Sequence, residues 1–172
     1  KAELEAYAAW FHEVMPRRIE ELSSWVRATP GFETWSPDGT PDSLARLGAW
    51  FEAQVETRRK SNADLEEERA RLVFPIEAPE DELTSRTFSL AMDVGMYFGR
   101  VISESLPGTH WDQPLKNRKF VDYGQPVLMG FGTVPLNPVR IAVMLAYGIS
   151  RRQQGGERLR GLFDTWAKMK KA

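Results

Sequence analysis

The sequence predicts a mainly helical α+β domain with a small antiparallel sheet of two or three strands between a central helix and the C-terminal helices. Apolar residues recur at helical spacing along most of the chain, and strand-like runs are confined to residues 110–131. The length of 172 residues suits one compact domain. We therefore expect a single domain over residues 1–172.

The N-terminal part predicts two helices joined by a turn-rich loop over residues 32–39. Pro16 interrupts the first helix, so we expect a kink or two abutting helices there. Thr40 and Pro41 predict the N-cap and first position of the second helix. The apolar stripe of the first helix comprises Leu4, Tyr7, Phe11, Val14, Ile19, Leu22, Trp25 and Val26.

Residues 56–80 predict a charged extension, either a solvated helix or a linker, between the N-terminal helices and the central helix. Just before Pro75, three apolar residues are expected to pack the extension against the rest of the domain: Leu72, Val73 and Phe74. Three acidic residues over 80–82 then predict the start of the central helix, because carboxylates are favoured at the positive end of the helix dipole.

The central helix carries a stripe of small residues at Ala91, Gly95 and Gly99. A glycine inside a helix costs about 1 kcal/mol relative to alanine. The stripe therefore predicts that another backbone approaches this helix closely, at the centre of the core.

The remaining elements follow a Pro-Gly break at residues 107–108. Residues 110–113 and 120–123 predict a hairpin around a polar turn, and residues 126–131 predict a further strand. Asn137 and Pro138 predict the start of the next helix, and Gly155 and Gly156 predict its end, before one last helix.

Enzymatic activity has no motif behind it. The chain has no cysteine, which excludes thiol nucleophiles and cysteine-ligated metals, and it has only two histidines. It carries no serine nucleophile elbow and no phosphate-binding glycine loop. We expect no cofactor and favour a protein that is not an enzyme. A metal-dependent hydrolase remains an alternative, with His110 and Asp112 on one strand face and Asp122 across the hairpin.

Charge is distributed unevenly along the chain. The first 82 residues hold 10 basic and 18 acidic side chains, whereas the last 90 hold 13 basic and 6 acidic ones. The basic half raises the alternative of binding nucleic acid or a phosphate ligand. Its candidate residues are Lys116, Arg118, Lys119, Arg151 and Arg152.

The preferred prediction is a non-catalytic protein-binding module. Trp35 lies in a polar loop with Asp38, and exposed tryptophans are common interface anchors. The acidic run Glu66, Glu67 and Glu68 in the extension would add charged contacts. We expect a cytoplasmic protein with a protein partner and no membrane span.

A resemblance points the same way. The run from Asp93 to Arg100, Trp111, the run from Pro126 to Leu128 and the proline-led helix at Pro138 resemble small uncharacterised bacterial proteins, some of the immunity type that neutralise toxins. The resemblance covers roughly residues 90–150. It implies an inhibitor that occludes a partner toxin or enzyme, and it supplies no catalytic residue.

Overall fold

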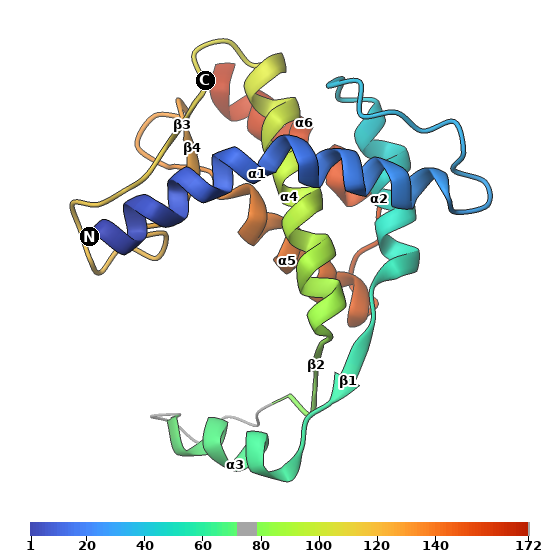
Figure 1. The fold of residues 1–172 in the computed structure, drawn as a ribbon, viewed down its shortest axis with the longest axis vertical. Coiled ribbons are helices and arrows are strands. Elements are labelled where there is room, and N and C mark those ends of the chain that lie inside the picture. The colour runs from blue at the N-terminus through green and yellow to red at the C-terminus, as the bar shows by residue number, and fades with distance from the viewer. Residues whose placement is uncertain (72–78, 172) are drawn as a thin grey trace.

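The computed structural model describes residues 1–71 and 79–171 (Figure 1). In this part of the chain six helices and two two-stranded antiparallel sheets confirm the mainly helical α+β class. The helices are α1 (Ala2–Arg27), α2 (Ser43–Gln54), α3 (Asn62–Arg71), α4 (Ser85–Ser105), α5 (Pro138–Ser150) and α6 (Arg158–Lys171). The strands are β1 (Thr57–Arg59), β2 (Asp81–Leu83), β3 (His110–Asp112) and β4 (Val127–Met129).

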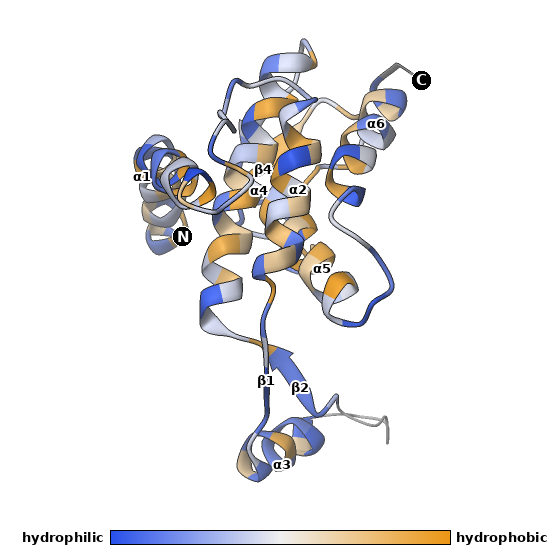
Figure 2. Ribbon diagram, turned by 90° about the vertical axis from the view of Figure 1, so that its right-hand side faces the viewer, coloured by the Kyte–Doolittle hydropathy of each residue, from blue (hydrophilic) through white to orange (hydrophobic). Residues whose placement is uncertain are grey.

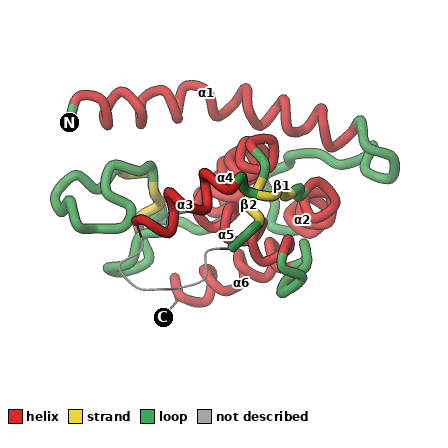
Figure 3. The backbone as a smooth tube through the Cα atoms, turned by 90° about the horizontal axis from the view of Figure 1, so that it is seen from below, coloured by secondary structure: helices red, strands yellow, loops and turns green. Residues whose placement is uncertain are grey.

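Helix α4 lies at the centre of the helical body. It begins at the N-cap Thr84, whose hydroxyl accepts a hydrogen bond from the Thr87 backbone N–H. Figure 3 shows α1 along one side of the body, α4 and α2 in the middle, and α5 and α6 on the other side. Most residues of α4 are buried, because neighbouring helices cover it from both sides.

The predicted close approach to the glycine stripe is confirmed. A Cβ atom on Gly95 would lie 2.6 Å from the Cα of Val139, and one on Gly99 would lie 2.5 Å from the Trp111 ring. The start of α5 and the indole of β3 therefore occupy the space that side chains would fill. The packing gained in this way offsets the helical cost of both glycines.

A buried ion pair joins α1 to α4. Arg18 donates from Nε and Nη2 to the two carboxylate oxygens of Asp93, each over 2.7 Å. The Asp93 side chain is only 4% exposed, whereas Arg18 reaches the surface and also donates to Glu21. The hydrogen bonds to Asp93 raise the pKa of the Arg18 guanidinium, whereas burial raises the pKa of the Asp93 carboxyl and makes its charge depend on this arginine.

Two predicted helix starts are wrong. Helix α2 begins at Ser43 with Asp42 at its N-cap, because Thr40 instead donates to the Asp38 side chain and closes a turn before the helix. The acidic residues over 80–82 do not open a helix either, since Asp81 and Glu82 pair with β1.

Helix α1 contains Pro16 within one continuous helix, so the alternative of two abutting helices is also wrong.

The second sheet also differs from its predicted pairing. Strand β3 pairs with β4, with Trp111 opposite Leu128, rather than with residues 120–123. Those residues form turns, in which the Phe120 N–H donates to the Asn117 carbonyl and the Tyr123 N–H to the Phe120 carbonyl. The apolar run over 127–129 wins the pairing because two of its three residues are buried.

The charged extension leaves the body as a projecting arm, defined here as residues 57–71 and 79–83. Strands β1 and β2 form a ribbon with Thr57 opposite Leu83 and Arg59 opposite Asp81, and α3 lies at its tip. Figure 2 shows the arm as largely hydrophilic and directed away from the body. Helix α3 covers Asn62–Arg71 and has no buried residue, which agrees with the solvated-helix alternative for that part of the extension. The sequence did not predict strands β1 and β2 on either side of it. The predicted docking of residues 72–74 lies outside the described residues.

Adding one methyl group at Gly95 should destabilise the protein. The Gly95→Ala variant forces its Cβ against the α5 backbone and should lower the free energy of unfolding by about 2 kcal/mol. Gly161→Ala on α6 is the matched control, because its Cβ would meet nothing closer than 4.0 Å and should stabilise the helix by about 1 kcal/mol. Urea unfolding measures both values, and equal effects of the two substitutions would contradict the close packing.

Removing the arginine of the buried pair should be costly at neutral pH. Arg18→Met leaves the Asp93 carboxylate buried without its partner and should cost about 3 kcal/mol in unfolding experiments at pH 7. The loss should shrink at pH 3, where Asp93 can take up a proton. Arg17→Met removes only an exposed ion pair and should cost less than about 0.5 kcal/mol. Equal losses of unfolding free energy in the two variants would show that the buried Arg18–Asp93 pair does not stabilise the contact between α1 and α4.

Candidate functional site

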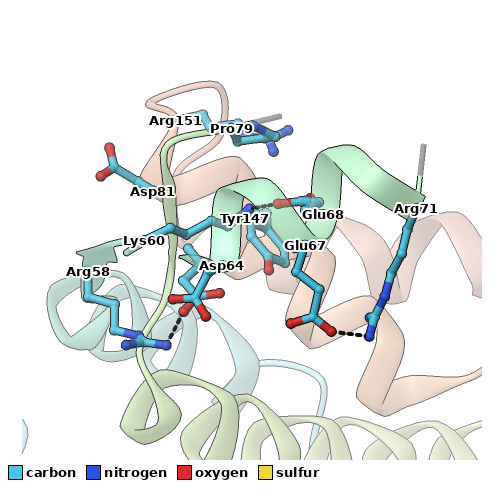
Figure 4. A pocket seen from close by; sticks show the side chains of 11 residues that line it. Arg58, Lys60, Asp64, Glu67, Glu68, Arg71, Pro79, Asp81, Tyr147 and Arg151 are labelled. Atoms are coloured by element: carbon cyan, nitrogen blue, oxygen red, sulfur yellow. Dashed lines mark hydrogen bonds and ion pairs between the residues drawn. The ribbon is translucent and has the colours of Figure 1, made fainter. Parts of the chain in front are cut away.

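A charged cleft of about 520 Å³ lies between the arm and the C-terminal end of α5 (Figure 4). Its walls come from the ribbon, from α3 and from α5. The lining residues are Arg58, Lys60, Asp64, Glu67, Glu68, Arg71, Pro79, Asp81, Glu82, Tyr147 and Arg151. Five carboxylates and four basic groups therefore meet in one concave surface.

Helix α3 contributes one of its faces to the cleft. Asp64, Glu67, Glu68 and Arg71 are spaced at i, i+3, i+4 and i+7, which places them side by side on a helix. The neighbouring face, with Leu65, lines a smaller cavity against the ribbon. Both faces of this short helix thus carry mainly polar and charged side chains, and neither packs into a hydrophobic core.

Ion pairs within the arm hold its shape. Lys60 pairs with Glu68 on α3, and its side chain is only 10% exposed. Figure 4 shows this pair as a dashed line, together with the pair of Glu67 with Arg71 along α3. The Lys60–Glu68 pair connects α3 to the residue that follows β1, so α3 is held in place without burying any of its own residues.

The start of α3 is capped by a reciprocal pair of side chains. The Ser61 hydroxyl donates to the Asp64 carboxylate over 2.7 Å, and the Asp64 backbone N–H donates back to the Ser61 oxygen over 3.2 Å. The hydrogen bonds from Ser61 lower the pKa of Asp64, so this cleft residue stays ionised.

The body wall of the cleft combines one aromatic ring, that of Tyr147, with the cation of Arg151. The Arg151 guanidinium lies 5.5 Å from the centroid of the Tyr147 ring, and Tyr147 in turn meets Phe88 on α4 edge-on at 6.3 Å. Arginine and tyrosine are enriched among the residues that dominate protein interfaces. The wall of the cleft opposite the charged arm therefore carries residue types that are common at protein interfaces.

The residue after Arg151 is strained. Arg152 has φ of +56°, and no other non-glycine residue in the described part of the chain has a positive φ. Its N–H donates to the Ile149 carbonyl, and the next N–H donates to the Gly148 carbonyl, which closes the end of α5. Glycine is the usual residue at such a position. The chain therefore places an arginine, Arg152, where glycine is usual, at some cost in backbone strain.

One predicted anchor is wrong. Trp35 is only 3% exposed, and its ring meets Tyr97 at 5.5 Å while its Nε1 donates to the Ser43 carbonyl. The indole nitrogen finds a buried acceptor, so Trp35 closes the loop over the core instead of facing a partner. Asp38 is exposed but is engaged with Thr40 in its own turn.

The acidic run lies on the arm, on the surface of the molecule. Glu66 and Glu67 are exposed and Glu68 is half-buried against Lys60. Glu67 and Glu68 line the cleft together with Arg151, a residue that the basic alternative had selected. Candidates from two competing predictions thus meet in one place, where their charges offset one another.

Sequence reasoning also missed an exposed tryptophan. Trp25 is 59% exposed and lines a cavity of about 340 Å³ with Arg86 and Leu90. Helical spacing had assigned Trp25 and its neighbour Val26 to the same apolar stripe. Adjacent residues are about 100° apart on a helix, so only one of them can face the core fully.

The basic residues do not form one surface with a shared cavity. Lys116 lines a cavity beside β3, whereas Arg151 lies in the cleft among five carboxylates. Arg118, Lys119 and Arg152 are exposed at the surface. A polyanion at the cleft would meet acidic groups as well as basic ones, which weakens the case for nucleic-acid binding.

The predicted metal set does not assemble. His110 and Asp112 are exposed on β3, but Asp122 is only 1% exposed. Asp122 instead accepts from Asn137 Nδ2 over 2.9 Å and pairs with Arg140 over 2.9 Å. Among the residues that the structure describes, no three His, Cys, Asp or Glu side chains gather as a metal site. The hairpin assumed for this set is absent because β3 pairs with β4.

No protein-family model, no curated protein and no solved structure matches this chain. The resemblance to immunity-type proteins over residues 90–150 therefore stays a prediction. Within the described residues, no helix is both long and apolar enough to cross a membrane.

Relieving the strain at Arg152 should stabilise the protein. Arg152→Gly fits the left-handed backbone without a Cβ and should raise the free energy of unfolding by about 1 kcal/mol. Gln153→Gly next to it, where φ is not positive, should not stabilise. Thermal and urea unfolding compare the two, and a loss of stability in Arg152→Gly would contradict the strained cap.

Proposed function

We propose that this chain is a non-catalytic protein-binding module that contacts its partner through the arm and the adjoining cleft. An immunity-type inhibitor, which covers the surface of a toxin or enzyme, is the specific form of this proposal. The observation that carries it is a projecting helix, α3, that buries none of its own residues.

The energetics of the arm support this proposal. Ordering a residue costs about 1–2 kcal/mol of backbone entropy, and exposed ion pairs return less than about 1 kcal/mol each. Most of the ion pairs in the arm are exposed, such as that of Arg59 with Glu80. An ordered arm adds little to the stability of the body, so its use is to present a surface.

The charge pattern of the cleft supports a protein partner over nucleic acid. Both signs of charge occur in the cleft, and the Tyr147 ring lies on its body wall beside Arg151. Complementary charges of both signs provide specificity between proteins, whereas binding to a phosphate backbone requires a predominantly basic surface.

The proposal is tested by reversing charge on the arm. The chain with Glu66→Lys and Glu67→Lys should keep its melting temperature within about 2 °C, since both side chains are exposed. It should lose a partner that the unchanged protein retains at near-equal stoichiometry in purification from its native source. Glu13→Lys with Glu20→Lys on α1 is the matched control and should retain the partner.

Site-specific cross-linking locates the contact. A photo-reactive residue at Ala63 or Ala70, both exposed on α3, should cross-link to the same partner, whereas one at the exposed Ala45 on α2 should not. Absence of any stoichiometric partner, or cross-linking from α2 alone, would overturn the proposal.

A further inference from the structure

A separate, largely apolar cavity of about 440 Å³ lies beside β3 and β4, in the loop that follows β3. It shares no lining residue with the arm cleft. Its volume falls within the range of about 300–1,000 Å³ that is typical of small-molecule sites. The apolar part of its lining comprises Pro114, Leu115, Phe120, Met129 and Pro135.

The rim of this cavity carries one group of each charge. Asp112 supplies a carboxylate and Lys116 supplies an ammonium, with Asn117 and Thr133 as neutral polar groups. Neither charged side chain makes an ion pair with any residue that the structure describes. Asp112 accepts the Gln113 N–H through Oδ1, which leaves its other oxygen free for a ligand.

Hydrogen bonds hold the cavity wall in place. Gln113 donates from Nε2 to the Leu4 carbonyl over 2.6 Å and to the Gly124 carbonyl over 2.9 Å. The Gly124 N–H donates back to the Pro114 carbonyl over 2.9 Å. The loop is thus fastened at both of its ends and to α1, so the cavity is formed before a ligand arrives.

We propose that this cavity binds a free amino acid with a large apolar side chain. Asp112 takes the α-ammonium group, Lys116 takes the α-carboxylate, and the side chain packs on Leu115, Phe120 and Met129. A phosphate or other multiply charged anion would meet the carboxylate of Asp112, and a simple cation would meet the ammonium of Lys116. The apolar floor requires a hydrocarbon or aromatic group on the same molecule.

Three probes that differ in one charge each test this proposal. L-phenylalanine carries both charges, N-acetyl-L-phenylalanine carries only the carboxylate, and L-phenylalanine amide carries only the ammonium. In ¹H–¹⁵N NMR titrations of the full chain, L-phenylalanine should shift the signals of residues 112–120 and of Met129. Each blocked probe should bind at least about 10-fold more weakly, because one charge-assisted hydrogen bond is lost.

Two variants should each abolish the preference for L-phenylalanine over one of the two blocked probes. Asp112→Asn should bind L-phenylalanine and its N-acetyl form equally, and Lys116→Met should bind L-phenylalanine and its amide equally. Lys119→Met changes an exposed lysine of the same loop that does not line the cavity, and it should keep the full selectivity. All three positions are exposed, so thermal unfolding should show unchanged folding.

Other outcomes overturn the proposal in distinct ways. Equal binding of the N-acetyl form to the unchanged protein would assign the cavity to the C-terminus of a polypeptide, and equal binding of the amide would assign it to an N-terminus. No shift with any probe would remove the site. None of these results bears on the arm, because the two sites share no lining residue.

Discussion

The close contact between α4 and the start of α5 is the constraint on which the rest of the structure depends. Gly95 lets the α5 backbone approach, and Gly99 accepts the ring of Trp111 from β3. Asn137 then caps α5 through its side-chain oxygen and donates to Asp122 through its amide nitrogen. The absence of side chains at Gly95 and Gly99 thus fixes the positions of α5, of β3 and of the loop that lines the apolar cavity.

The body and the arm are held together by different physical means. The body has a continuous hydrophobic core and a buried ion pair between Arg18 and Asp93. The arm relies on ion pairs at or near the surface, such as Lys60 with Glu68. Because exposed ion pairs contribute little to folding, surface changes on the arm can alter binding without unfolding the body. The residues that stabilise the body are therefore largely distinct from the charged residues exposed on the arm.

The arm cleft and the apolar cavity both bring together residues of opposite charge. Glu67 and Glu68 come from the acidic half of the chain and Arg151 from the basic half, and all three line the cleft. Asp112 and Lys116 were candidates for a metal and for nucleic acid, and they line one apolar cavity instead. At both of these cavities, the uneven charge along the sequence is balanced locally, because acidic and basic residues line each of them together.

The sequence by itself determined the mainly helical class, the glycine contact and the exposed charge of residues 62–71, but not every helix boundary. These features depend on local periodicity and on the cost of a helical glycine, both of which can be read without knowing the neighbours. Only the tertiary structure decided that Trp35 is buried, that Asp81 and Glu82 enter a strand and that Asp122 turns away from His110. Each of these outcomes depends on a partner outside the local segment: the Tyr97 ring for Trp35, the β1 strand for Asp81 and Glu82, and the Asn137 amide for Asp122. Local sequence patterns predict the secondary structure and exposure that a residue favours, but its hydrogen-bond and packing partners depend on which distant segments the fold brings next to it.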